Sequence, residues 1–284
     1  MSLDYEVEYN NRARVPEHAE IFARWAADAA AYRERMKADE NAELGLAYGT
    51  SPRQIVDLFF PEATGHTPLA LFVHGGYWRS LSASSFSHMA AGLNAKGVAV
   101  AVAGYDLCPQ VTIGQIITQI RTACLFLWRR FGERLMVYGH SAGGHLAGCM
   151  LATDWKKFDP KAPADLVPAG YSISGLFDLA PLVHTAMNAD LRLDEVEVAR
   201  VSPLNWPVSN PRVFDAVVGG AESSEFLRQS RVVVDTWRAK GVDAHYEEVP
   251  GANHFTVLDP LSDANSAMTA RCAALAAKCA KVEK

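Results

Sequence analysis

The sequence predicts an α/β protein with a mostly parallel central sheet, helices on both faces and a small helical insertion that acts as a cap. Three observations support this fold class. Short runs of β-favouring residues alternate with longer helical segments along most of the chain. Most successive runs are far enough apart for the crossover helix that parallel strands need. The 284 residues are 49% hydrophobic and 21% charged, a balance typical of a globular protein.

The elements follow one another in a regular order. Apolar residues at helical spacing predict an N-terminal helix over 17–38, and a connector rich in Gly, Pro and Ser follows at 48–52. Strands are expected at 55–60, 69–74, 98–105, 134–139, 169–174, 214–219 and 244–249. Only the short connector 61–68 separates the first two strands, so we expect them to pair antiparallel. Helical segments fill the later gaps and close the chain.

Residues 179–210 interrupt this alternation with helical patches and several prolines, and we interpret them as a cap-like insertion. We therefore divide the chain into a helical N-terminal extension, 1–48, packed on the domain, and a domain of the α/β type, 49–284. The sequence leaves open whether the extension covers the functional site or packs on the outside.

Composition narrows the function. The net charge is −5 and the pI is near 6.0, so neither nucleic acid nor an anionic membrane is an expected partner. Five scattered cysteines without CxxC spacing indicate neither disulfides nor a zinc site, and we expect no metal and a cytoplasmic location. The N-terminus lacks the apolar stretch of a secretory signal, and no apolar run approaches the ~18 residues of a membrane span. A small-molecule substrate is the favoured partner.

The strand at 134–139 leads directly into Gly139-His140-Ser141-Ala142-Gly143, followed by a helical run. This is the G-x-S-x-G pattern in its strand–turn–helix context, which presents a serine hydroxyl at the carboxyl end of a strand. The start of the following helix favours negative charge at that point. We therefore predict that Ser141 is a nucleophile.

A serine nucleophile needs a base and an acid that orients the base. In this architecture the acid and then the histidine follow the serine in the chain. His254 follows the last strand and is the candidate base. Glu222, after the strand at 214–219, is the preferred acid, with Asp178 after the preceding strand as its rival. Glu225 instead fits the first turn of the next helix, which Ser223 or Ser224 would cap.

Acyl transfer also needs donors for the oxyanion. His74-Gly75-Gly76-Tyr77-Trp78 follows the strand at 69–74 and matches the HGG-type loop of esterases and lipases. We place the oxyanion hole at Gly75, Gly76, Tyr77 and Ala142, with the amides of the last three as donors. The glycines let the backbone approach the substrate oxygen.

These motifs resemble the α/β-hydrolase fold over about residues 50–284. More narrowly, the segments 74–78, 139–145 and 222–230 resemble the kynurenine formamidase (arylformamidase) branch of the esterase/lipase hydrolases. Tyr48-Gly49, the run 57–61 and Ser202-Pro203 also fit that branch. Glu222 is a departure, because the animal enzymes carry Asp at the acid position, so a close orthologue is not indicated.

The resemblance implies hydrolysis of N-formyl-L-kynurenine to kynurenine and formate, a step of tryptophan catabolism, without metal or organic cofactor. The residue chemistry by itself supports acyl hydrolysis of an aromatic amide or ester, and a carboxylesterase for short acyl esters stays an alternative. A hydrolase-fold binding protein is a second alternative, against which the intact triad argues. A homodimer is one assembly that the sequence leaves open. Candidate walls of the substrate pocket are Tyr77, Trp78, His140, Phe177, Leu182 and Met187, each of which could equally serve core packing.

Overall fold

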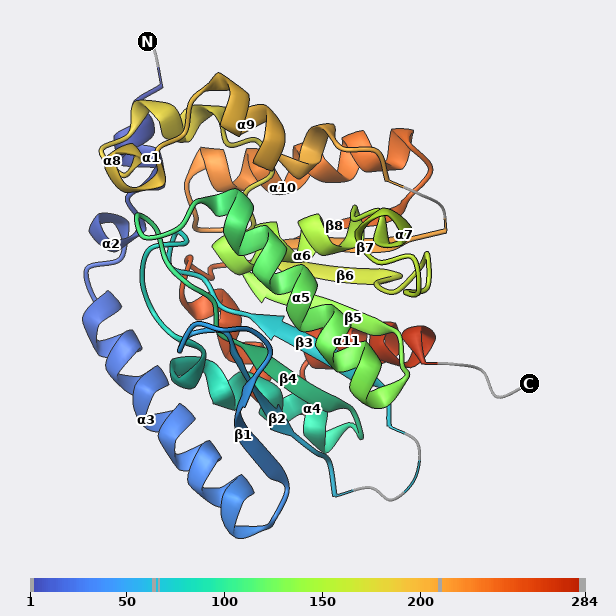
Figure 1. The fold of residues 1–284 in the computed structure, drawn as a ribbon. Coiled ribbons are helices and arrows are strands. Elements are labelled where there is room, and N and C mark those ends of the chain that lie inside the picture. The colour runs from blue at the N-terminus through green and yellow to red at the C-terminus, as the bar shows by residue number, and fades with distance from the viewer. Residues whose placement is uncertain (1–2, 63–64, 66, 209–210, 281–284) are drawn as a thin grey trace.

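The computed structural model describes residues 3–62, 65, 67–208 and 211–280. These residues form one eight-stranded sheet with the order β1-β2-β4-β3-β5-β6-β7-β8 (Figure 1). The strands are β1 (Ala42–Ala47), β2 (Ile55–Phe59), β3 (Leu69–Val73), β4 (Ala99–Ala103), β5 (Leu135–His140), β6 (Ala169–Ile173), β7 (Val213–Gly219) and β8 (Asp243–Val249). The seven expected strands are present within one residue of their predicted ends, except that β4 ends two residues early. β1 is an additional strand.

The sheet is parallel from β4 to β8, whereas β2 runs antiparallel to both β1 and β4. The prediction that the strands at 55–60 and 69–74 pair with each other is wrong, because β4 lies between them. Every residue of β3 is buried, which is typical of a central strand with parallel partners on both sides. The connector 60–68 is also longer than an ordinary hairpin loop. Residues 63, 64 and 66 of this connector lie outside the described part of the chain.

Alternate residues of the strands supply two apolar cores, one on each face. In β3, Leu69, Leu71 and Val73 belong to one core, and Ala70 and Phe72 belong to the other. The first face is covered by α5 (Ile113–Phe131) and α6 (Ala142–Leu151), and the second by α3 (His18–Ala38) and α11 (Ala267–Cys279) (Figure 1). The predicted two-faced α/β architecture is therefore confirmed.

The remaining helices complete both layers and the cap. They are α1 (Tyr5–Tyr9), α2 (Asn11–Arg14), η1 (Ala83–Ala90), α4 (Ala91–Ala95), α7 (Trp155–Phe158), η2 (Ala180–His184), α8 (Asn188–Leu191), α9 (Glu195–Val201), η3 (Pro203–Asn205), α10 (Ser224–Ala239) and η4 (Thr256–Ser262), where η denotes a 3₁₀ helix. Local sequence signals set several ends. The side chains and backbone amides of Thr112 and Gln115 form a reciprocal capping box at the start of α5, and Gly132 ends that helix with φ 72°.

The segment expected as an N-terminal extension is tied into the sheet by β1, which pairs with β2. Ahead of β1, α3 lies along the lower left side of the molecule in Figure 1, and α1 reaches the cap formed by η2, α8 and α9. A boundary between 48 and 49 therefore falls between two paired strands of one sheet. Three short stretches of the predicted divisions lie outside the described residues. They are the two ends of the chain, 1–2 and 281–284, and residues 209–210 of the predicted insertion.

Candidate active site

The turn between β5 and α6 holds Ser141 in a strained backbone conformation. Its φ and ψ are 55° and −117°, outside the regions that L-residues ordinarily occupy. The neighbouring glycines are needed for space, because a Cβ on Gly139 would come within 2.4 Å of the Gly143 carbonyl oxygen. A Cβ on Gly143 would come within 1.9 Å of the Val73 carbonyl oxygen. The G-x-S-x-G pattern thus corresponds to a strand–turn–helix with Ser141 at its tip.

Two loops at the carboxyl ends of β7 and β8 bring Glu222 and His254 together. Nδ1 of His254 lies 2.6 Å from Oε2 of Glu222, and both side chains are buried. In a neutral ring, a proton on Nδ1 that is donated to the carboxylate leaves Nε2 as an acceptor. The pair can therefore take up a proton at Nε2 and stabilise the resulting positive charge.

Ser141 and His254 line the same pocket. In the described part of the chain, the Ser141 hydroxyl makes no hydrogen bond to the His254 ring. Such contacts often shorten only when substrate is bound. The neighbouring His140 donates from Nε2 to the carbonyl oxygen of His254 at 2.7 Å, which ties the serine turn to the histidine loop.

Burial and the nearby His254 ring lower the pKa of His140 well below its usual value of 6.5. The His140 ring is therefore neutral at neutral pH. Because its Nε2 proton is donated to the His254 carbonyl, Nδ1 is left as an acceptor on a residue that lines the pocket.

The loop after β3 passes against the serine turn. A Cβ on Gly75 would lie 3.1 Å from the Cβ of Ser141, so the loop backbone is in contact with this residue. Gly76 and Tyr77 both have positive φ, of 107° and 49°. Ala142 is the first residue of α6, and its amide has no acceptor within the helix. This arrangement can provide backbone donors beside Ser141.

His74 is buried beneath this loop and does not line the pocket. Its Nδ1 lies 2.7 Å from the carbonyl oxygen of Gly75, and its ring stacks on Tyr105 with centroids 4.3 Å apart. Burial lowers the pKa of His74 to about 4, so the ring is neutral and donates this hydrogen bond. The Tyr105 hydroxyl donates to the His74 carbonyl oxygen at 2.8 Å. The first residue of the HGG pattern is thus a buried support for its glycines.

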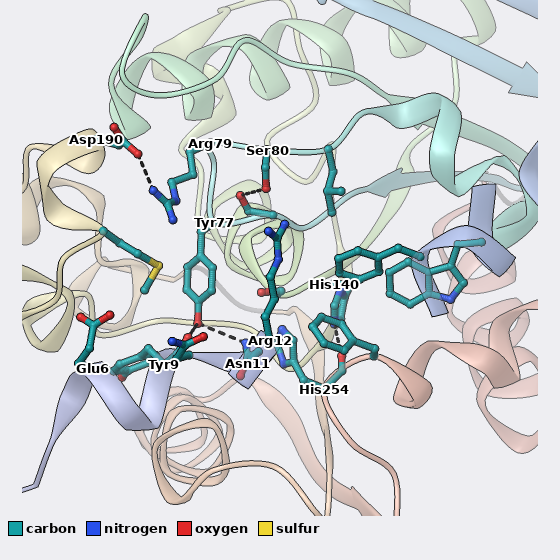
Figure 2. A pocket seen from close by; sticks show the side chains of 18 residues that line it. Glu6, Tyr9, Asn11, Arg12, Tyr77, Arg79, Ser80, His140, Asp190 and His254 are labelled. Carbon is teal, nitrogen blue, oxygen red and sulfur yellow. Dashed lines mark hydrogen bonds and ion pairs between the residues drawn. The ribbon is translucent and has the colours of Figure 1, made fainter. Parts of the chain in front are cut away.

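Figure 2 shows the pocket, which has a volume of about 250 Å³. Ser141, His140 and His254 are among the residues that line it. An aromatic wall is formed by Phe22 and Trp25 of α3 and by Phe255. The rings of Phe22 and Phe255 pack edge to face with centroids 5.0 Å apart. Charged and polar side chains also line the pocket, among them Glu6, Asn11, Arg12, Arg79, Ser80 and Asp190.

The N-terminal segment covers this pocket, which answers the question that the sequence left open. The Tyr9 hydroxyl donates to Oε2 of Glu225 at 2.6 Å and accepts from Nε2 of Gln229 at 3.0 Å. The Tyr77 hydroxyl donates to the backbone oxygen of Tyr9 at 2.7 Å and accepts from Nδ2 of Asn11 at 3.3 Å. The sequence analysis missed these N-terminal lining residues because they belong to no motif.

The structure divides the predicted pocket walls into two groups. Tyr77, His140 and Met187 line the pocket. The other three, Trp78, Phe177 and Leu182, are fully buried and are not among its lining residues. Trp78 packs perpendicular to His145 with centroids 5.0 Å apart, and Phe177 packs edge to face on Phe214 at 5.7 Å. These three side chains pack in the core and are not pocket walls. Core packing was the alternative that the sequence left open for each of them.

The rival acids have other partners. Asp178 lies 3.2 Å from Arg228, and Glu225 accepts from Arg228 at 2.7 Å as well as from Tyr9. Ser223 is the N-cap of α10 and accepts from the amide of Phe226. Of the three acids considered, Glu222 is the one that contacts His254.

The described residues contain no group of three or more His, Cys, Asp or Glu side chains arranged to hold a metal ion. None of the helices in the same ranges is long and apolar enough to cross a membrane.

Comparisons by sequence find one family model and several curated relatives. Residues 56–180 match the BD-FAE family model. The kynurenine formamidase of Salmo salar is 30% identical over 249 residues, which cover 83% of this chain and 82% of that protein. The kynurenine formamidase of Drosophila melanogaster is 33% identical over 227 residues, covering 75% of each chain.

Solved structures agree on the architecture. A candidate thioesterase from Silicibacter sp. TM1040 is 36% identical, with a TM-score of 0.85 and coverage of 95% of this chain and 98% of that one. An esterase from Pyrobaculum calidifontis, at 17% identity and a TM-score of 0.65, covers 80% of this chain and 81% of its own and shares the α/β-hydrolase fold.

Proposed function

The chain belongs to the kynurenine formamidase family, and on this premise we propose that it hydrolyses an aryl formamide such as N-formyl-L-kynurenine through Ser141, Glu222 and His254. The products would be kynurenine and formate. Family membership and the esterase-like fold make the protein a hydrolase of the formamide or ester type. One observation carries the proposed chemistry: His254, paired with Glu222 at 2.6 Å, lines the same pocket as Ser141.

In the first half-reaction, Nε2 of His254 takes the proton of the Ser141 hydroxyl as the oxygen attacks the formyl carbon. Glu222 stabilises the imidazolium, since its carboxylate already accepts from Nδ1. The new C–O bond forms while the carbonyl π electrons move to the oxygen. When the tetrahedral intermediate collapses, the C–N bond breaks and His254 gives its proton to the leaving aryl amine.

Water then enters and repeats the cycle on the formyl-serine ester. His254 accepts a proton from water as the hydroxide attacks the ester carbonyl. Collapse of the second intermediate releases formate and returns the proton to Ser141. The amides of Gly76, Tyr77 and Ala142 are proposed to stabilise the oxyanion in both steps, with each donor contributing about 3 kcal/mol.

The pocket suits a small acyl group attached to an aromatic leaving group. A formyl group carries only hydrogen beyond its carbonyl, so it needs little room between Ser141 and the glycine loop. The aromatic wall of Phe22, Trp25 and Phe255 offers ring faces and edges to an aryl amine. A volume of about 250 Å³ lies just below the range of typical pockets for drug-sized ligands, which favours a substrate of one aromatic ring.

A carboxylesterase for short acyl esters is the second candidate. The structural likeness to solved esterases favours it, because ester hydrolysis uses the same nucleophile, base and oxyanion donors. The discriminating feature is the leaving group, since an amide nitrogen must be protonated before it leaves and a nitrophenolate need not be.

Parallel kinetics test the proposal. We expect turnover of N-formyl-L-kynurenine with kcat/KM of at least about 10⁴ M⁻¹s⁻¹, within the ordinary enzymatic range. p-Nitrophenyl acetate serves as the ester comparison, and the Ser141→Ala variant controls for contaminating hydrolases. Rapid ester hydrolysis without formamide turnover would replace the formamidase proposal with the esterase alternative.

A further inference from the structure

Some of the charged side chains around the pocket already have an ion-pair or hydrogen-bond partner in the protein. Arg79 forms an ion pair with Asp190, with Nη1 and Oδ2 separated by 2.5 Å. Glu6 accepts from the amide of Ala186 at 2.7 Å through Oε2. These side chains are used to connect the pocket rim to the cap.

Arg12 is different. It is solvent-exposed and lines the pocket, and within the described ranges its guanidinium makes no ion pair. The guanidinium instead lies over the Phe22 ring, whose centroid is 5.6 Å from the guanidinium carbon. A cation over an aromatic face is held weakly when exposed, by about 0.5–1 kcal/mol, and keeps its hydrogen-bond donors free.

The backbone that carries Arg12 is fixed relative to the proposed reaction centre. Asn11, its neighbour on α2, donates to the Tyr77 hydroxyl at 3.3 Å, and the Tyr9 carbonyl oxygen accepts from the same hydroxyl at 2.7 Å. Tyr77 in turn belongs to the loop that contacts Ser141. In the view of Figure 2, the Arg12 side chain lies between Tyr77 and the His140–His254 pair. Arg12 is thus a held but unpaired cation at the pocket that contains Ser141.

We propose that Arg12 binds a carboxylate on the leaving group, so that this enzyme prefers aryl formamides whose side chain carries a carboxylate. The inference rests on the proposed function for the identity of the bond that is cleaved. Guanidinium presents a planar pair of donors that matches a carboxylate in two parallel hydrogen bonds. Phe22 contributes to both parts of the site, because its ring contacts the guanidinium and also belongs to the aromatic wall.

The test is a comparison of two substrates that differ in one charge. N-formyl-L-kynurenine is paired with its decarboxylated analogue, N-formylkynuramine, and kcat/KM is measured for wild type and Arg12→Gln. The analogue keeps the ammonium group and lacks only the carboxylate. A hydrogen bond to a charged group is worth about 1.5–3 kcal/mol, so the ratio of kcat/KM with the carboxylate to kcat/KM without it should fall by about 10- to 100-fold in Arg12→Gln. Most of the change should be in KM. This ratio does not depend on the fraction of active enzyme.

Arg14→Gln is the matched control, because Arg14 is also exposed on α2 but does not line the pocket. It removes the same charge from the protein and should leave the ratio unchanged. Raising the salt concentration should raise the wild-type KM for the substrate with the carboxylate, and this dependence should be weaker in Arg12→Gln. An equal loss on both substrates, or the same change in Arg14→Gln, would overturn the assignment.

The kinetics distinguish failure of the proposed function from failure of the proposed anion site. If the wild type hydrolyses p-nitrophenyl acetate but neither formamide, the formamidase proposal fails while the anion site can still be measured. The pair is then 4-acetoxybenzoate and its methyl ester, with the same two variants. A charged-to-neutral ratio unaffected by Arg12→Gln on these esters would refute the anion site itself.

Discussion

The hydroxyl of Ser174 donates to Oε1 of Glu222 at 2.5 Å, on the opposite carboxylate oxygen from the one that faces His254. The amide of Gly219 donates to the same Oε1 at 2.8 Å. Three donors therefore surround one buried carboxylate and fix its rotation. Ser174 itself has φ 53°, and its amide donates to the Val217 carbonyl oxygen at 2.7 Å, so its position is set by the neighbouring strand.

Ser174 should act as a positioning residue for the acid. In Ser174→Ala, Glu222 loses one of its three donors, and we expect kcat to fall by about 5- to 30-fold while KM changes by less than about twofold. Ser172→Ala is the control, because this buried hydroxyl on β6 has no hydrogen-bond partner among the described residues. Steady-state kinetics that show the same loss in both variants would indicate a general packing effect instead.

The identity of the acid can be tested by ranking substitutions. Ser141→Ala and His254→Ala should each lower kcat by about 10⁶-fold, and Glu222→Ala by about 10⁴-fold, as in other serine hydrolases that lose one triad member. Asp178→Ala should cost less than about tenfold, because Asp178 pairs with Arg228 and not with His254. If Asp178→Ala were the more damaging of the two acid variants, the acid would have to be reassigned.

The sequence predicts those parts of the site that depend on neighbouring residues in the chain. Gly139 and Gly143 are needed by the turn at Ser141, and Glu222 and His254 each follow a strand whose carboxyl end reaches the same edge of the sheet. The fold was predicted for a similar reason, since the alternation of short β-favouring runs with helical segments is itself a local feature of the sequence.

The rest depends on contacts between residues far apart in the chain. Arg12 belongs to a segment whose Tyr9 is bound by Glu225 and Gln229, more than 200 residues away. Trp25 reaches the pocket on α3, which packs against η1 and Phe255. No local pattern encodes these contacts. Neighbouring residues in a motif can also point to different places: Tyr77 lines the pocket, whereas Trp78 packs into the core. Strand order was missed for the same reason, because partner choice is settled by the whole sheet.

The docking of the N-terminal segment should depend on the Tyr9 hydroxyl. Tyr9→Phe removes a buried donor to Glu225 and the acceptor for Gln229, which should weaken docking by about 1–3 kcal/mol. Limited trypsin digestion at Arg12 and Arg14 should become faster, and KM should rise. The Tyr5 hydroxyl has no hydrogen bond in the described part of the chain, so Tyr5→Phe is the control. Unchanged digestion in Tyr9→Phe would mean that other contacts hold the segment.

Chelation should leave the reaction intact. The proposed mechanism uses a serine nucleophile, a histidine base and amide donors, none of which needs a metal ion. Dialysis against EDTA should therefore change kcat/KM by less than about twofold. A loss that added Zn²⁺ or Mn²⁺ restores would contradict this mechanism.

Folding stability should decrease below neutral pH because of buried neutral histidines. His88 on η1 is 6% exposed, neither of its ring nitrogens has a hydrogen-bond partner among the described residues, and burial lowers its pKa to about 4. In the unfolded chain the pKa is near 6.5, so between pH 6.5 and 4 the unfolded state binds more protons and the free energy of unfolding decreases as pH falls. The slope from one such group is up to about 1.4 kcal/mol per pH unit.

The buried rings of His74 and His145, whose pKa values burial also lowers to about 4, contribute in the same direction. His88→Leu should therefore remove the contribution of one histidine to the pH dependence of the free energy of unfolding. At pH 5 the variant should be more stable than wild type by about 2 kcal/mol. Urea unfolding at pH 7.5, 6 and 5 measures this. His245→Gln is the control, because the His245 side chain is 51% exposed. If the free energy of unfolding of His88→Leu changed with pH as steeply as that of wild type, His88 would have to keep its proton in the folded protein.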